Sequence, residues 1–214
     1  MAINLYNMDC MEALAKMPDK AFDLAIVDPP YGINKLWVGG QGSGWGKAKE
    51  EGKTRAWDNE VPPSEYWQNL KRVSINQIVW GGNYFVEYLG NSRCWLIWNK
   101  PERGFSLSEA ELAWTSFDKV VRVFDYHRNE TGRNHPTQKP VKLYEWLLRN
   151  YAKEGDKILD THLGSGSISI ACYNMGFALD GYELDKDYYE AAVKRLDDHK
   201  RQGTLFAPKV IYGH

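Results

Sequence analysis

The chain has 214 residues and a formal net charge of −1, which suits one domain and excludes a polycation that binds nucleic acid through its overall charge. Hydrophobic residues make up 43% and charged residues 26%, which excludes a disordered or fibrous chain. The cysteines, Cys10, Cys94 and Cys172, have no C-x-x-C spacing, so we expect no disulfide framework, no metal site and a reducing, cytoplasmic location. No apolar run suits a signal peptide or a membrane span.

Apolar patterns along the chain predict an α/β fold. Short apolar runs at 22–28, 157–160 and 177–183 each predict a buried strand. Helices are expected where apolar residues recur at helical spacing, namely Ile168, Ala171, Cys172 and Met175, and then Tyr189, Ala192, Val193 and Leu196. A strand–helix–strand–helix order of this kind forms a parallel sheet. The other expected elements are a helix over 141–152 and strands near 76–80, 94–98, 111–115 and 120–126.

Two segments do not fit regular elements. Residues 33–63 hold six glycines with interspersed tryptophans, and we expect a mobile loop because long irregular segments in compact domains are usually functional or disordered. Residues 119–142 carry six Lys or Arg against two acidic residues. This stretch is either a solvated basic face or a phosphate-contacting surface. In the second case, the candidate DNA-binding residues are Lys119, Arg122, Arg128 and Arg133.

The tetrapeptide Asp28-Pro29-Pro30-Tyr31 follows a predicted buried strand, where α/β sheets bind ligands. It is either a strand terminator or a site for methylating an exocyclic amine of a nucleobase. Such an amine is a poor nucleophile because its lone pair is delocalised into the ring. The Asp28 carboxylate and the Pro29 carbonyl can accept its two N–H bonds, which returns the lone pair to nitrogen. The prolines stiffen the turn, and the Tyr31 ring can stack on an extruded base.

A glycine turn follows the strand that ends at Asp160, with Gly164 and Gly166 between strand and helix. A tight turn alone explains it, but Glu183 lies about twenty residues further on, where an acid binds the ribose hydroxyls of an adenosine-type cofactor. The turn lacks the lysine of a phosphate-binding loop, which disfavours hydrolysis of a nucleoside triphosphate. A cationic sulfonium cofactor fits better among Asp28, Asp160 and Glu183.

Three motifs together resemble a known family. DPPYG (28–32), NHPTQKP (134–140) and DTHLGSGS (160–167) followed by GYE are similar to motifs of the amino DNA methyltransferases that use S-adenosylmethionine. Their order resembles the circularly permuted beta class, and WGGNYF (80–85) and ELAWTSF (111–117) resemble the small phage and prophage adenine methyltransferases. The resemblance implies a doubly wound, mainly parallel sheet of the Rossmann-like class I methyltransferase fold. It also implies a single domain with an inserted target-recognition segment at about 100–135.

The resemblance also implies a site. Asp28, Pro29, Pro30 and Tyr31 would be catalytic. The cofactor-binding residues would be Asp9, Cys10, Asp28, Thr137, Gln138, Lys139, Asp160, His162, Gly164, Ser165, Gly166 and Glu183. Of these, Asp9 and Cys10 would lie near the cofactor adenine, Glu183 at the ribose, and 137–139 at the methionine end. The family commonly has Pro-Phe where this chain has Thr161-His162, so His162 is either a flat ring against the cofactor or a structural histidine.

The implied reaction is site-specific methyl transfer to adenine N6 on a flipped base of double-stranded DNA, without a covalent enzyme intermediate. Aspartate in the first position of the tetrapeptide favours adenine, and Cys10 and Cys172 lack the P-C dipeptide of C5-cytosine enzymes. Two alternatives stay open, an N4-cytosine methyltransferase and an inactive relative that only binds cofactor or DNA. Homodimers are common in this subgroup. The target sequence, and whether a restriction enzyme accompanies the protein, are not fixed by these motifs.

Overall fold

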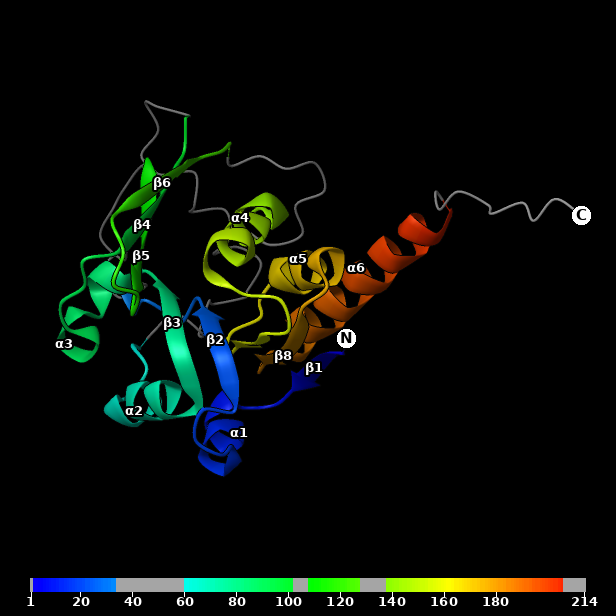
Figure 1. Cartoon of the computed structure of the whole chain (residues 1–214). Helices are drawn as coiled ribbons and strands as arrows, with labels where there is room; N and C mark the ends of the chain where they lie inside the picture. The colour runs from blue at the N-terminus through cyan, green and yellow to red at the C-terminus, as the bar shows by residue number, and fades with distance from the viewer. Residues whose placement is uncertain (1, 34–59, 102–107, 128–137, 206–214) are drawn as a thin grey trace, which may run out of the picture.

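The computed structural model describes residues 2–33, 60–101, 108–127 and 138–205 (Figure 1). Within these ranges, eight strands form one sheet in the order β1-β8-β7-β2-β3-β5-β4-β6. The strands are β1 (Ile3–Asn7), β2 (Phe22–Val27), β3 (Ser74–Trp80), β4 (Trp95–Asn99), β5 (Ala110–Thr115), β6 (Arg122–Asp125), β7 (Lys157–Asp160) and β8 (Ala178–Glu183). The helices are α1 (Cys10–Lys16), α2 (Ser64–Val73), the 3-10 helix η4 (Gly82–Tyr84), α3 (Val86–Leu89), α4 (Val141–Tyr151), α5 (Ser167–Met175) and α6 (Lys186–Leu205).

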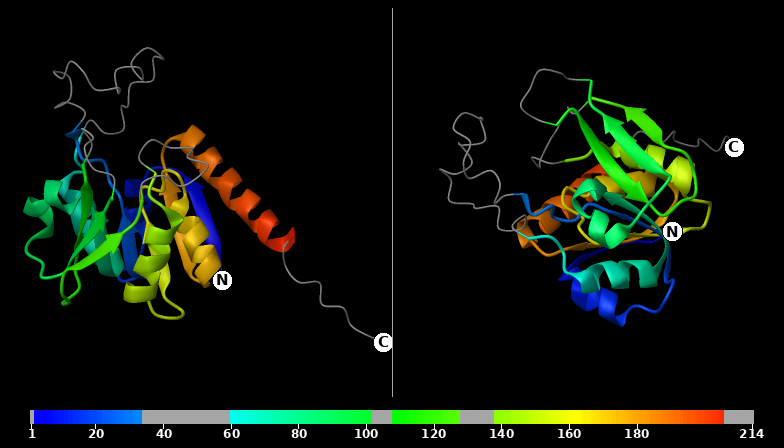
Figure 2. Two further views of the ribbon diagram at one scale, coloured as in Figure 1. Left: turned by 90° about the horizontal axis from the view of Figure 1, so that it is seen from above. Right: turned by 90° about the vertical axis from the view of Figure 1, so that its left-hand side faces the viewer.

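The sheet is mainly parallel, and helices cover both of its faces. Only β5 runs against its neighbours, β3 and β4. Alternate residues of β2 enter different cores, because successive side chains of a strand point to opposite faces. Leu24 and Ile26 pack in the cluster of α4 and α5, whereas Ala25 and Val27 pack in the cluster of α1 and α2. Figures 1 and 2 show the two helical layers on either side of the sheet, with α6 beside β8 and β1.

The predicted α/β fold with a doubly wound, mainly parallel sheet is confirmed. Each of the predicted helices and strands lies within a few residues of an observed one. Five elements were missed, among them the short η4 and α3, which have three and four residues. The other three are β1, α1 and α2. The edge strand β1 has only partly buried residues, and α1 has seven residues. The third, α2, carries an apolar pattern at Tyr66, Trp67, Leu70 and Val73 that does signal a helix. In the described ranges, no helix is long and apolar enough to cross a membrane.

The predicted catalytic and cofactor-binding residues that the structure describes gather at one edge of the sheet, the edge formed by the carboxyl ends of the parallel strands. The strand order reverses between β7 and β2, and α/β proteins bind ligands at the carboxyl ends beside such a switch point. Asp28 follows β2 directly, Asp160 ends β7 and Glu183 ends β8. The sheet thus brings together residues that are far apart in the sequence.

Candidate active site

Both carboxylate oxygens of Asp28 have a partner. The Tyr31 hydroxyl donates to Oδ1 at 2.5 Å, and the Lys139 ammonium donates to Oδ2. The Lys139 side chain is 3% exposed and also pairs with Glu111 Oε2 at 3.2 Å. Burial alone lowers the pKa of Lys139, but the carboxylates of Asp28 and Glu111 outweigh it and raise that pKa above its ordinary value. Lys139 is therefore a charged ammonium held between two carboxylates.

The Tyr31 ring lies in an aromatic corner built from the WGGNYF segment. It stacks on Tyr84 with ring centroids 5.0 Å apart and meets Phe85 edge-on at 6.0 Å. Gly81 leaves room for the ring, because a Cβ atom there would lie 2.2 Å from Tyr31 Cε1. Gly81 also has φ +66, a conformation that favours glycine. The motif WGGNYF (80–85) was expected to mark the family but not to form part of the site, although its two adjacent glycines beside a strand signal a close approach.

Glu111 and Lys100 extend the charges around Asp28 and were also missed. Lys100 Nζ donates to Glu111 Oε1 at 2.5 Å, so Glu111 lies between two ammonium groups. Burial raises the pKa of Glu111, but Lys139 and Lys100 outweigh it and lower that pKa below its ordinary value. In the sequence, the sign that could have revealed Glu111 is a single charged residue in an otherwise mainly apolar predicted strand, 111–115.

The predicted cofactor loop is fixed by Glu183. Its Oε2 accepts the Gly164 backbone N–H at 2.8 Å, and its Oε1 accepts that of Asp185 at 3.0 Å. Gly164 and Gly166 have positive φ, and a Cβ at Gly166 would lie 2.9 Å from Ala192 Cβ, so α6 packs closely under the turn. At Gly164 a Cβ would meet only the His162 carbonyl, at 4.0 Å, so the backbone is open to a ligand there. The Ser165 carbonyl accepts from Arg195 at 3.0 Å.

The carboxylates of Asp160 and Glu183 both accept hydrogen bonds from backbone N–H groups. The Asp160 residue is 2% exposed and its Oδ1 accepts the His162 backbone N–H at 3.0 Å. Burial outweighs this bond and, with the charges of Asp28 and Glu183, raises the pKa of Asp160 to about 8. Burial also raises the pKa of Glu183. Neither carboxylate has an ion pair among the described residues, so a cationic ligand would favour their ionised forms.

His162 has polar and aromatic partners. Its Nδ1 lies 2.9 Å from Thr161 Oγ1, which in turn lies 2.7 Å from the Tyr66 hydroxyl. The Tyr66 ring meets the imidazole edge-on at 5.5 Å. Burial lowers the pKa of His162 to about 4, so its ring is neutral at neutral pH. These contacts agree with a structural role for His162. They also place its flat, uncharged ring beside the cofactor loop, so both alternatives stay open.

Asp9 and Cys10 lie at the start of α1, next to the end of β8. Asp9 caps this helix by accepting the Met11 N–H at 2.8 Å, and Met8 N donates to the Glu183 carbonyl at 3.1 Å. Burial raises the pKa of the Cys10 thiol to about 12, so it is not a nucleophile at neutral pH. Gln138 is buried next to Lys139, whereas Thr137 lies outside the described residues.

The predicted DNA-binding residues do not gather at this edge. Lys119 donates to the Asn150 carbonyl at 3.1 Å and lies over the Tyr151 ring, at the C-terminal end of α4. Arg122 begins β6, which runs in the same direction as β3 and β4. Both are therefore at the edge opposite Asp28, and their DNA contact stays a prediction. Arg128 and Arg133, and most of the predicted loop 33–63, lie outside the described residues.

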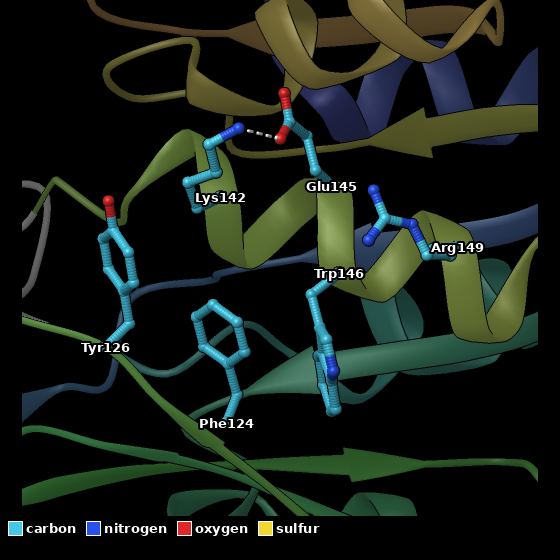
Figure 3. Close-up of a pocket in the computed structure, with 6 residues that line it drawn as sticks. All are labelled: Phe124, Tyr126, Lys142, Glu145, Trp146 and Arg149. Atoms are coloured by element: carbon cyan, nitrogen blue, oxygen red, sulfur yellow. Dashed lines mark hydrogen bonds and ion pairs between the residues drawn. The ribbon is translucent and has the colours of Figure 1, made fainter.

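A cavity of about 220 Å³ lies between β6 and α4 (Figure 3). Figure 3 shows the rings of Phe124, Tyr126 and Trp146 around it, with Lys142 paired to Glu145. Arg149 completes the lining. None of the predicted catalytic or cofactor residues lines this cavity, so it is separate from the predicted site.

The fold is that of DNA methyltransferases. The structure of M1.HpyAVI in complex with S-adenosylmethionine superposes with a TM-score of 0.61 at 21% identity and covers 91% of this chain and 100% of that one. The cytosine-N4-specific PvuII DNA methyltransferase also gives a TM-score of 0.61, at 11% identity, with 94% and 92% of the two chains covered. At such identities the likeness concerns the fold alone.

The sequence comparisons identify the family. The DNA methylase family model N6_N4_Mtase matches residues 47–194, and the chain belongs to this family. The type II methyltransferase M2.DpnII of Streptococcus pneumoniae is 26% identical over 90% of this chain and 89% of that protein. M.HpaI of Haemophilus parainfluenzae is 38% identical over 72 residues, which are 34% of this chain and 23% of that protein. The protein is thus a DNA methylase of a family that includes both N6- and N4-type enzymes.

Proposed function

We propose that this DNA methylase transfers the methyl group of S-adenosylmethionine to N6 of adenine in double-stranded DNA. The observation that carries the proposal is the position of the Asp28-Pro29-Pro30-Tyr31 turn. It lies beside the acidic, glycine-lined ends of β7 and β8 at one edge of the sheet. That edge offers acceptors for an amine next to a place for a cationic cofactor.

The residues present fit S-adenosylmethionine. When bound, this cofactor supplies an electrophilic methyl group on a positively charged sulfur. Asp160 and Glu183 lack an ion-pair partner among the described residues and have raised pKa values, which a cation would relieve. Glu183 would bind the ribose hydroxyls, and Asp9 and Cys10 would lie beside the adenine. The turn formed by Gly164, Ser165 and Gly166 would lie along the bound cofactor. Gln138, Lys139, His162 and Thr137 complete the proposed set.

The catalytic turn prepares the amine of an extruded base. Asp28 Oδ1 and the Pro29 carbonyl accept its two N–H bonds, so the nitrogen lone pair points at the methyl carbon. The Tyr31 hydroxyl, which donates to Oδ1 in this structure, must give way to the amine, and the ring then stacks on the base. Pro30 keeps the turn rigid. As the N–C bond forms, the C–S electron pair stays on sulfur, and the excess proton on nitrogen afterwards leaves to water.

The proposal includes a single domain over 1–214, with target recognition at about 100–135. In the described part of that segment, β5 and β6 extend the sheet beyond β3. A homodimer and a role in a restriction–modification or orphan phage-type system belong to the same proposal. The second candidate is N4-cytosine methylation, because the matching family includes N4-type as well as N6-type enzymes. Aspartate in the first position of the turn favours adenine.

Acid depurination of labelled DNA tests the proposal. Unmethylated genomic DNA is incubated with the protein and S-adenosylmethionine labelled in the methyl group, with RNA and protein mixtures in parallel. We expect label in DNA only, and we expect mild acid to release it with the purines. Label that stays with the pyrimidines would favour the cytosine candidate, and label in RNA or protein alone would contradict a DNA substrate.

A further inference from the structure

A row of four alternating charges runs from the catalytic turn into the outer strands of the sheet. Ion pairs join Asp28 to Lys139, Lys139 to Glu111, and Glu111 to Lys100. Asp28 follows β2, Lys139 precedes α4, Glu111 lies in β5 and Lys100 follows β4. The side chains of Lys139 and Lys100 are 3% and 6% exposed. This charge row therefore ties four separate segments together inside the protein.

Lys139 has two anionic partners and an aromatic one. Its ammonium contacts Asp28 Oδ2, lies 3.2 Å from Glu111 Oε2, and sits 5.3 Å from the centroid of the Trp80 ring. A buried ammonium is stable only while an anion stays close. Because Glu111 supplies a second carboxylate, Lys139 can loosen its contact with Asp28 without losing its counter-charge.

Methyl transfer to an amine is favoured by that loosening. The target amine is proposed to bind Asp28 Oδ1, and an ammonium held tightly on Oδ2 draws negative charge away from that acceptor. The amine nitrogen also gains positive charge as the N–C bond forms, and a cation held fully on Asp28 opposes that charge. A carboxylate behind Lys139 reduces both effects.

We propose that Glu111 is a positioning residue for methyl transfer, which shares the Lys139 ammonium with Asp28 and so leaves Asp28 available to the target amine. The inference rests on the proposed function, because it takes Asp28 as the acceptor for that amine. Lys100 holds the other oxygen of Glu111 at 2.5 Å and lies 4.7 Å from the centroid of the Trp98 ring. It thereby fixes the direction in which Glu111 faces Lys139.

The test is the isosteric variant Glu111→Gln, which keeps the shape and removes the charge. We expect kcat to fall by about 10- to 100-fold, the scale of a misplaced catalytic group, while the Kd for S-adenosylmethionine and the KM for DNA stay near wild type. Glu111→Asp keeps the charge on a shorter side chain, and we expect it to recover part of kcat. Glu145→Gln is the matched control, because it removes a carboxylate 2.8 Å from Lys142 on α4, and we expect an unchanged kcat.

An active wild type with an equally active Glu111→Gln overturns the inference. A loss of kcat that comes with lost cofactor and DNA affinity and a lower Tm, and that Glu111→Asp does not recover, shows a structural role and also overturns it. If Glu111→Gln does not fold, Lys100→Gln decides, because it releases the Glu111 oxygen that Lys100 holds: a reduced kcat with wild-type affinities supports the inference, and a wild-type kcat overturns it. A wild type that methylates no DNA overturns the proposed function, and this inference with it.

Discussion

The two halves of the carboxyl edge balance their charges in different ways. On the side of β7 and β8, Asp160 and Glu183 are bonded to backbone N–H groups and have no ion pair among the described residues. On the side of β2 and β5, Asp28 and Glu111 alternate with lysines in the charge row. Burial acts on both halves, but only the second contains cations that offset it.

This difference has a direct effect on protonation. The pKa of Asp160 is raised to about 8, whereas the pKa of Glu111 is lowered. At neutral pH, Asp160 in the first half becomes fully ionised only when a cation arrives, which suits a sulfonium cofactor. In the second half, the lysines keep Glu111 ionised without a ligand. Substitutions in one half should therefore leave the other half largely unchanged.

Asp28→Asn should have the largest effect. The amide keeps the shape and one acceptor oxygen but loses the negative charge and replaces the other oxygen by a donor, so it holds the amine less well and no longer offsets the charge that develops on it. We expect the single-turnover rate of methyl transfer to fall by about 10²- to 10³-fold, as for other lost electrostatic contacts to a transition state. Asp125→Asn is the control, since that carboxylate is exposed on β6 and bonded to Asn99 at 2.5 Å. A rate within a factor of about two of wild type in Asp28→Asn would remove Asp28 from catalysis.

Glu183→Gln should weaken the cofactor half alone. It loses a charged acceptor for the ribose and for the Gly164 N–H, and hydrogen bonds to charged groups contribute about 1.5–3 kcal/mol. We expect the Kd for S-adenosylmethionine to rise by roughly 10- to 100-fold, with kcat at saturating cofactor close to wild type. Isothermal titration and steady-state rates check this. Glu190→Gln, on the exposed side of α6, serves as control, and a fall in kcat with an unchanged Kd would contradict the assignment.

Cofactor binding should depend on pH through Asp160. Below its pKa of about 8, Asp160 is protonated in the free protein, and a cation favours the carboxylate. Affinity for S-adenosylmethionine should therefore rise with pH up to about 8, by at most about tenfold per pH unit for one proton. Asp160→Asn should lose this component. Titrations with S-adenosylmethionine at several pH values measure this dependence. A Kd of the wild type that does not change with pH would show that the ionisation of Asp160 is not coupled to cofactor binding.

Gly81→Ala should act on the other half, with the smallest expected effect on catalysis. Both Gly81 and Gly176 lie in the left-handed region, with φ 66 and φ 81, so alanine at either position costs about 1–2 kcal/mol of backbone strain. Of these two positions, only at Gly81 would the new Cβ meet Tyr31, since nothing lies within 4 Å at Gly176. We expect denaturant unfolding to show a loss in both variants and methylation assays to show a lower kcat only in Gly81→Ala. Equal kcat values in the two variants would show that the position of the Tyr31 ring does not affect catalysis.

The fold and part of the site were predictable from the sequence, for physical reasons. Strands β2, β7 and β8 are buried on both faces and therefore appear as short apolar runs. The turns after them carry motifs whose members are close in sequence. The edge strand β1 has little buried surface to mark it. The charge row was not predictable, because Lys139 and Asp28 are 111 residues apart and a lone Glu111 or Lys100 gives no sign of its partner.

The most direct test is to identify the methylated nucleoside. Unmethylated DNA treated with S-adenosylmethionine and either wild type or Asp28→Asn is digested to nucleosides and analysed by mass spectrometry. We expect N6-methyldeoxyadenosine from wild type and almost none from Asp28→Asn. N4-methyldeoxycytidine as the product, or equal amounts of N6-methyldeoxyadenosine from both proteins, would contradict this expectation.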